Sequence, residues 1–132
     1  MKKDNFRDYT VDALRYYSMC GKPTSADLRR MKDVLPPGKI AALLDLEAVD
    51  HMLHRLEGEE YGMTGVLCVE MVYFASPSRT ASRSQITERV KNAAKALCVC
   101  ESSVYRALRR ARILFAIERG LRLDEPELII PR

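Results

Sequence analysis

Four side chains in the last third of the chain can form hydrogen bonds along one face of a helix. Ser102, Tyr105, Arg106 and Arg109 recur at spacings of three, one and three residues, which places them on one side of an α-helix. An arginine can donate two parallel hydrogen bonds to O6 and N7 of guanine in the major groove of DNA. Glu101 can accept a hydrogen bond from cytosine. We therefore take these five residues as candidates for base contacts.

Basic charge is concentrated in the same part of the chain. Residues 1–75 contain 10 Lys and Arg against 12 Asp and Glu, whereas residues 76–132 contain 12 against 6, within a net charge of +4. A local excess of positive charge favours an anionic partner such as double-stranded DNA. The candidates for phosphate contacts in this region are Lys91, Ser103, Arg110 and Arg112.

Two predicted helices must position these side chains. The first spans 84–97, with Ser84 as a possible N-cap. Its apolar face consists of Ile86, Val90, Ala93, Ala94 and Leu97. A break at 98–101 precedes a second helix, which Ser102 or Ser103 can cap. The inner face of that helix consists of Val104, Leu108, Ala111 and Phe115. Helices joined by so short a turn must cross.

This spacing is typical of a DNA-binding helix-turn-helix, here at about 86–120 with 102–112 as the recognition helix. The small side chain of Ala94 permits close crossing of the two helices. Cys98 lies where many such motifs have a turn glycine, and its Cβ makes a left-handed backbone less favourable there. The sequence therefore predicts an all-α fold, a helical bundle with a C-terminal helix-turn-helix.

A second apolar stripe follows Arg112. Ile113, Ala116 and Ile117 lie on the side of the helix away from its predicted inner face. We expect the helix to leave the groove near Arg112 and to pack within the chain, while a homodimer interface is the alternative.

The first half of the chain is expected to form helices at 8–20, 25–34 and 39–57, with the Pro-Pro-Gly segment 36–38 as a break. The apolar segment 66–74 suits a buried strand equally well, but we interpret it as a helix. A polar loop is expected at 76–84. The expected divisions are a helical scaffold or interaction region at 1–61, a connecting helix at 62–75 and the DNA-binding region with its tail at 76–132.

Other functional classes find little support. Cys20, Cys68, Cys98 and Cys100 are expected to be reduced and mostly buried, because their spacing fits neither a disulfide framework nor a zinc site. His51 and His54 are interpreted as part of a solvated polar helix face rather than a metal site. No phosphate-binding glycine loop or catalytic motif is present, so we expect neither an enzyme nor a cofactor. We also expect a cytoplasmic protein, since neither a secretory signal nor a membrane span is recognisable.

Several segments together resemble a known family. They are Val-Glu-Met-Val-Tyr-Phe at 69–74, Ala-Ala-Lys-Ala-Leu at 93–97, Val99, Ser-Ser-Val-Tyr-Arg at 102–106 and Phe-Ala-Ile-Glu-Arg-Gly-Leu at 115–121. This pattern resembles phage-encoded transcriptional regulators of the ArpU type, which are similar to the sigma-factor region that binds the promoter −35 element. The resemblance implies regulation of phage or prophage genes, a helix at 66–74 and contact with RNA polymerase.

The sequence thus predicts a sequence-specific DNA-binding regulator that places helix 102–112 in the major groove. Two other classes stay open. One is a phage DNA-packaging protein similar to a terminase small subunit, which also uses a basic helix-turn-helix. The other is a helical protein-interaction module with no role in nucleic-acid binding.

Overall fold

The computed structural model describes residues 5–74 and 83–121, and the secondary structure of this part of the chain is entirely helical. The elements are α1 (Asn5–Met19), α2 (Ser25–Val34), the 3-10 helix η1 (Pro37–Lys39), α3 (Ile40–Glu57), α4 (Gly62–Tyr73), α5 (Arg83–Leu97) and α6 (Glu101–Arg119). The predicted all-α fold is confirmed.

Local sequence signals explain where α2 begins and ends. The Thr24 hydroxyl accepts a hydrogen bond from the Asp27 amide at 3.2 Å, and the Asp27 carboxylate accepts one from the Thr24 amide at 3.1 Å. This reciprocal capping satisfies two amides that the helix itself leaves unpaired. After Val34, the prolines at positions 36 and 37 prevent continuation. The predicted bounds of 25–34 are those of α2.

The ambiguous segment 66–74 is helical, as we expected, because α4 covers it up to Tyr73. Helix α4 begins at Gly62, four residues before position 66, where the predicted apolar segment begins. A Cβ atom on Gly62 would lie 2.0 Å from the Leu56 carbonyl oxygen, so only glycine allows α4 to start this close to α3. Gly65 is also tightly packed, since its Cβ would meet the Leu56 side chain at 3.2 Å.

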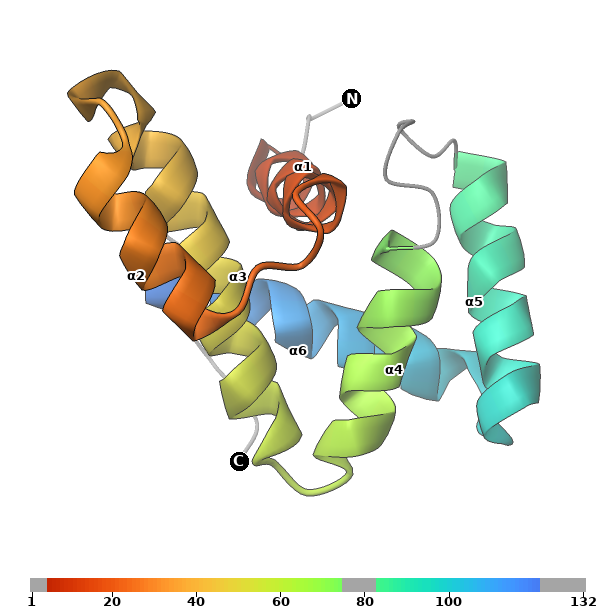
Figure 1. The fold of residues 1–132 in the computed structure, drawn as a ribbon. Coiled ribbons are helices and arrows are strands. Elements are labelled where there is room, and N and C mark those ends of the chain that lie inside the picture. The colour runs from red at the N-terminus through yellow and green to blue at the C-terminus, as the bar shows by residue number, and fades with distance from the viewer. Residues whose placement is uncertain (1–4, 75–82, 122–132) are drawn as a thin grey trace.

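Helix α6 packs against α1, α3, α4 and α5. It crosses behind α3 and α4 and reaches α5 at its N-terminal end (Figure 1). Leu108, Leu114 and Phe115 of α6 are almost completely buried, and the Phe115 ring lies 6.2 Å from that of Tyr9 on α1. One hydrophobic cluster combines buried residues from all six α-helices. Residues on both sides of the expected division at 75 and 76 therefore share this core.

Ion pairs also join α6 to the first half of the chain. Arg119 donates to the Asp45 carboxylate at 2.7 Å, and Arg55 donates to Glu118 at 3.0 Å. Both pairs connect α3 with the C-terminal end of α6. The position of α6 is thus set by hydrophobic packing and by these pairs.

The second apolar stripe of α6 is buried except at Ile117. Ile113 and Ala116 are buried in a small cluster with Leu121, so the second stripe packs within the chain as expected. Ile117 does not take part, because 42% of it is exposed.

The expectation that the cysteines are mostly buried was wrong: Cys20, Cys98 and Cys100 are exposed and only Cys68 is buried. The three exposed thiols lie at helix ends, where the core does not reach.

The expected loop at 76–84 falls largely outside the described residues. Positions 83 and 84 already belong to α5. No helix in the described ranges is long and apolar enough to span a membrane.

Candidate nucleic-acid interface

A three-residue turn, 98–100, joins α5 to α6. Cys98 has a left-handed backbone with φ of 57°. Its amide donates to the Lys95 carbonyl at 3.4 Å, and the Val99 amide donates to the Ala94 carbonyl at 3.0 Å. This is the Schellman arrangement that commonly ends a helix at a glycine. Cys98 therefore adopts the left-handed conformation for which glycine is better suited.

Helix α6 begins earlier than we expected. Cys100 is its N-cap residue, and the Cys100 carbonyl accepts from the amides of Ser103 at 3.0 Å and Val104 at 3.3 Å. The prediction that Ser102 or Ser103 caps the helix was wrong, because both lie within its first turn. The Cys100 Sγ atom lies 3.1 Å from each serine hydroxyl. Hydrogen bonds from Ser102 and then Ser103 lower the pKa of the Cys100 thiol to about 7.

The inner faces of α5 and α6 are packed as predicted. Val104, Leu108, Ala111 and Phe115 of α6 are buried. On α5, Val90, Ala93 and Ala94 are buried, whereas Ile86 and Leu97 are partly buried. The small side chains of Ala93 and Ala94 allow the two helices to approach closely. The two helices thus present their apolar sides to the core.

All five candidates for base contacts lie on the solvent-exposed side of α6. Glu101, Ser102, Tyr105, Arg106 and Arg109 are exposed within the first half of the helix, and 45% of Tyr105 is accessible. The structure therefore brings the predicted set together on one surface. We call these five residues the α6 outer face.

The four candidates for phosphate contacts divide into two pairs. Lys91 is exposed on α5, and Ser103 is half-buried beside the α6 outer face. Arg110, in contrast, donates from Nε to both carboxylate oxygens of Glu59, at 3.0 and 3.1 Å, and its Nη2 atom also bonds to Glu59. Arg112 donates to the Tyr73 hydroxyl at 3.0 Å. Both arginines of the second pair are thus partly buried and engaged by other side chains of the protein.

The Arg110 pair has electrostatic consequences. Its hydrogen bonds lower the pKa of Glu59 below the ordinary value and raise the pKa of Arg110. Both groups are therefore held in their charged forms at neutral pH. The carboxylate also neutralises the guanidinium locally, which reduces its attraction for a phosphate.

Lys95 is a basic residue that the predicted set does not include. It is exposed one helical turn after Lys91 on α5. The spacing of four residues is the signal that identifies it, since it places both ammonium groups on one face. Arg89 also belongs to α5, but it donates to the Val72 carbonyl at 3.0 Å and so joins α5 to α4.

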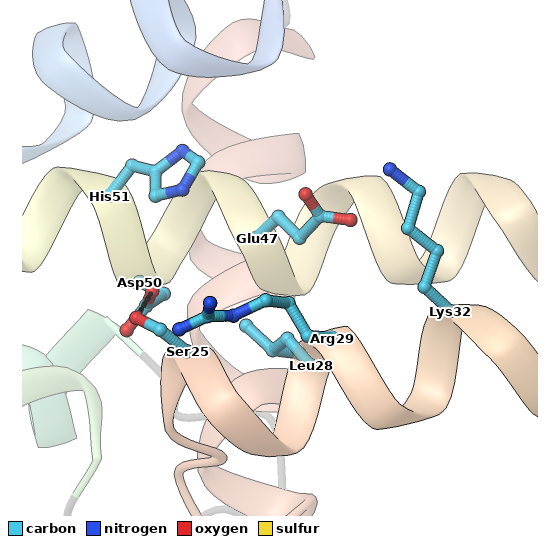
Figure 2. A pocket seen from close by; sticks show the side chains of 7 residues that line it. All are labelled: Ser25, Leu28, Arg29, Lys32, Glu47, Asp50 and His51. Atoms are coloured by element: carbon cyan, nitrogen blue, oxygen red, sulfur yellow. Dashed lines mark hydrogen bonds between the residues drawn. The ribbon is translucent and has the colours of Figure 1, made fainter.

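A separate hollow of about 300 Å³ lies between α2 and α3. Figure 2 shows Ser25 and Asp50 side by side there, with Arg29 on α2 and Glu47 on α3. Asp50 is only 4% exposed, and its carboxylate accepts a hydrogen bond from the Ser25 hydroxyl at 2.6 Å. The buried charge thus has a partner, as burial requires. The walls of this hollow carry both positive and negative side chains.

The histidines of α3 make contacts of their own. His54 Nδ1 lies 2.9 Å from the Asp50 carbonyl oxygen, and His51 Nδ1 lies 3.7 Å from a carboxylate oxygen of Glu118. Among the described residues, no group of three His, Cys, Asp or Glu side chains is arranged to hold a metal ion.

No family model, curated protein or solved structure matches this chain. The resemblance to ArpU-type regulators therefore stays a prediction.

Proposed function

We propose that the protein is a DNA-binding transcriptional regulator that inserts the first half of α6 into the major groove. The observation that carries the proposal is the combination of a tight left-handed turn at Cys98 with a polar α6 outer face. The opposite side of α6 is completely buried. A helix fixed in this way can present its exposed side chains to base edges without losing contact with the core.

The length of the α6 outer face agrees with one stretch of major groove. Ser102 and Arg109 are seven residues apart, which corresponds to about 10 Å along an α-helix at 1.5 Å per residue. Base pairs are stacked about 3.4 Å apart. The proposed contacts therefore cover about three consecutive base pairs.

Each residue has a chemical role in this proposal. Arg106 and Arg109 donate to guanine, Glu101 accepts from cytosine, and Ser102 and Tyr105 bond to neighbouring bases or phosphates. Lys91, Lys95 and Ser103 bind phosphates on the flanks. We leave Arg110 and Arg112 out of the interface, because their guanidinium groups contact Glu59 and Tyr73.

Selection of bound sequences from random DNA duplexes is the direct test. We expect one enriched motif. Arg106→Ala and Arg109→Ala should each weaken binding by about 1 to 3 kcal/mol and relax the preference at one base pair. Lys91→Ala should weaken binding to all sequences alike. Arg29→Ala, an exposed arginine on α2, is the matched control and should change neither affinity nor preference.

Salt dependence gives a second measurement. The cations to which the proposal assigns phosphate contacts are Lys91 and Lys95, and both are exposed. At about 0.9 per neutralised phosphate, two contacts give log K against log salt concentration a slope of about −1.8. Binding that does not depend on salt would refute the proposal. A ring-sized oligomer in solution would favour the DNA-packaging alternative instead.

A further inference from the structure

A cleft of about 540 Å³ lies between the α3–α4 connection and α6. One wall is formed by the end of α3, residues 59–61 and the start of α4, and the other wall by Val99 and α6. Its apolar lining consists of Leu56, Gly65, Val99, Ala107 and Ile113. Clefts of about 300 to 1,000 Å³ with mostly apolar walls are the usual form of small-molecule sites.

Ala107 keeps the cleft open. It lines the α6 wall and is half-buried, and its side chain ends at the Cβ atom. A longer side chain at this position would extend into the cleft. On the opposite wall, Gly65 brings the first turn of α4 against Leu56, because a Cβ atom there would meet the Leu56 side chain at 3.2 Å. The volume of the cleft therefore depends on alanine at position 107.

The charged residues of the lining are of both signs. Glu59 and Glu60 belong to the α3–α4 connection, and Arg106, Arg109 and Arg110 belong to α6. Arg110 donates from Nε to both carboxylate oxygens of Glu59, so a charge of one wall is satisfied by a charge of the other. A ligand with a net charge of either sign would meet a like charge on one wall. The lining therefore favours a molecule without net charge.

Tyr61 lines the same cleft in a conformation that is unusual for an aromatic residue. Its backbone is left-handed, with φ of 60°, and 82% of the residue is exposed. Its carbonyl accepts a hydrogen bond from the Gly65 amide at 3.2 Å, a contact that any residue could make. The left-handed backbone is unfavourable for a residue with a Cβ atom, and the fold gains little from a ring left in water. Strained residues of this kind gather at ligand sites.

We propose that this cleft binds an uncharged aromatic molecule that stacks on Tyr61. The molecule would contact Leu56, Ala107 and Ile113, and the apolar surface that it buries supplies the affinity. The Tyr61 ring would then lie against the ligand instead of water, and offset or edge-to-face pairs of rings are favourable beyond the area that they bury. The folded chain forms this cleft by itself, so binding requires no DNA. The site thus goes beyond the proposed function.

The fluorescent probe N-phenyl-1-naphthylamine tests the site, because it is aromatic and uncharged. Titration of the folded full chain in the absence of DNA should give one saturable site per chain. The probe 8-anilinonaphthalene-1-sulfonate has the same rings with a negative charge, and it should bind no more tightly. The absence of saturable binding of the uncharged probe would overturn the proposal. Binding of the sulfonate that is about tenfold tighter would overturn the assignment of an uncharged ligand.

Two alanine positions locate the site. Ala107→Leu should fill the cleft and lower the affinity for the uncharged probe by about tenfold or more. Ala96→Leu, at an exposed position on α5, is the matched control and should leave the affinity unchanged. Circular dichroism and thermal unfolding establish that each variant is folded. Unchanged probe binding in a folded Ala107→Leu protein would contradict the assignment of this cleft.

Substitutions of Tyr61 separate ligand binding from folding. Asparagine tolerates a left-handed backbone better than tyrosine does, so Tyr61→Asn should raise Tm by about 2 °C. The same variant should bind the uncharged probe about 2- to 10-fold more weakly, because the ring contact is lost. Tyr61→Phe retains the ring and should bind the probe like the unsubstituted protein. Equally tight binding by Tyr61→Asn would overturn the role of Tyr61. If the probe binds as expected but no DNA duplex does, the regulator proposal is refuted while the ligand site stands.

Discussion

The substitution Cys98→Gly should stabilise the protein. Cys98 has φ of 57°, a conformation in which a Cβ atom lies close to the backbone. Helix α6 ends with the same hydrogen-bond arrangement, in which Gly120 donates to Ile117 and Leu121 donates to Ala116. The residue equivalent to Cys98 is there a glycine, with φ of 76°. The same local structure thus occurs once with its preferred residue and once without it.

The expected gain is the difference of two terms. The left-handed conformation costs a residue with a Cβ atom about 1 to 2 kcal/mol. Glycine avoids this cost but loses about 0.5 to 1 kcal/mol more conformational entropy on folding. The Cys98 thiol is exposed, and its closest partner is the Lys95 carbonyl oxygen at 4.0 Å, so little side-chain interaction is lost. The difference of the two terms lies between about 0 and 1.5 kcal/mol, and its central value of about 0.8 kcal/mol corresponds to about 2 to 4 °C in Tm for a domain of this size.

Urea and thermal unfolding in reducing buffer measure the effect. Cys98→Ala retains the Cβ atom and should stay close to the unsubstituted protein, whereas Cys98→Val should lose more than about 1 kcal/mol, because a β-branched residue tolerates positive φ poorly. Cys100→Gly is a useful control, since Cys100 has φ of −79° and no such strain. If Cys98→Gly proved less stable than Cys98→Ala, the left-handed turn would be wrong, and so would the α5–α6 geometry on which the DNA interface depends.

Three other substitutions test the core, a cap and an ion pair. Phe115→Ala removes a fully buried ring and should cost about 3 to 5 kcal/mol in urea unfolding. Thr24→Ala removes the cap of α2 and should cost about 1 kcal/mol, measured in the same way. Glu59→Gln should cost up to about 1 kcal/mol at pH 7, because the carboxylate is partly exposed. Because folding lowers the pKa of Glu59, its contribution is present above the unfolded pKa and is lost as pH falls through the folded pKa. The difference between Glu59→Gln and the unsubstituted protein should therefore shrink at about pH 3, and a difference unchanged between pH 7 and pH 3 would contradict the ion pair.

Helix bounds could be predicted well wherever a local signal exists. The bounds of α2 are those predicted, and α3 begins one residue after the predicted position 39. Both agree because capping at Thr24 and the break at Pro36 and Pro37 act within a few residues of the helix ends. The start of α6 has no such signal. Cysteine is not a usual N-cap residue, so the serines at 102 and 103 were preferred wrongly.

The partners of the α6 arginines could not be predicted. Arg110 bonds to Glu59, 51 residues away in the sequence, and Arg112 to Tyr73, 39 residues away. Both pairs depend on how α6 crosses α4, and helical periodicity gives the face of a residue but not the neighbouring helix. Periodicity therefore correctly identified the exposed residues of the outer face, whereas it could not distinguish a basic residue that is free to bind phosphate from one paired inside the fold.

Ion pairs between the two halves of the chain reduce the uneven charge that each half presents to solvent. Two acidic residues of the first half, Asp45 and Glu59, are paired with Arg119 and Arg110 of α6. In the opposite sense, Arg55 of the first half pairs with Glu118 of the second. Two cations and one anion of the second half are thus neutralised within the fold, so its basic excess is reduced by one charge. Arg110 and Arg119 both belong to the second half of α6, where they bind a carboxylate of the α3–α4 connection and one of α3. The arginines of the α6 outer face, Arg106 and Arg109, are exposed. Net charge alone overstates the number of cations available to bind DNA, because some of them are paired with carboxylates of the same chain.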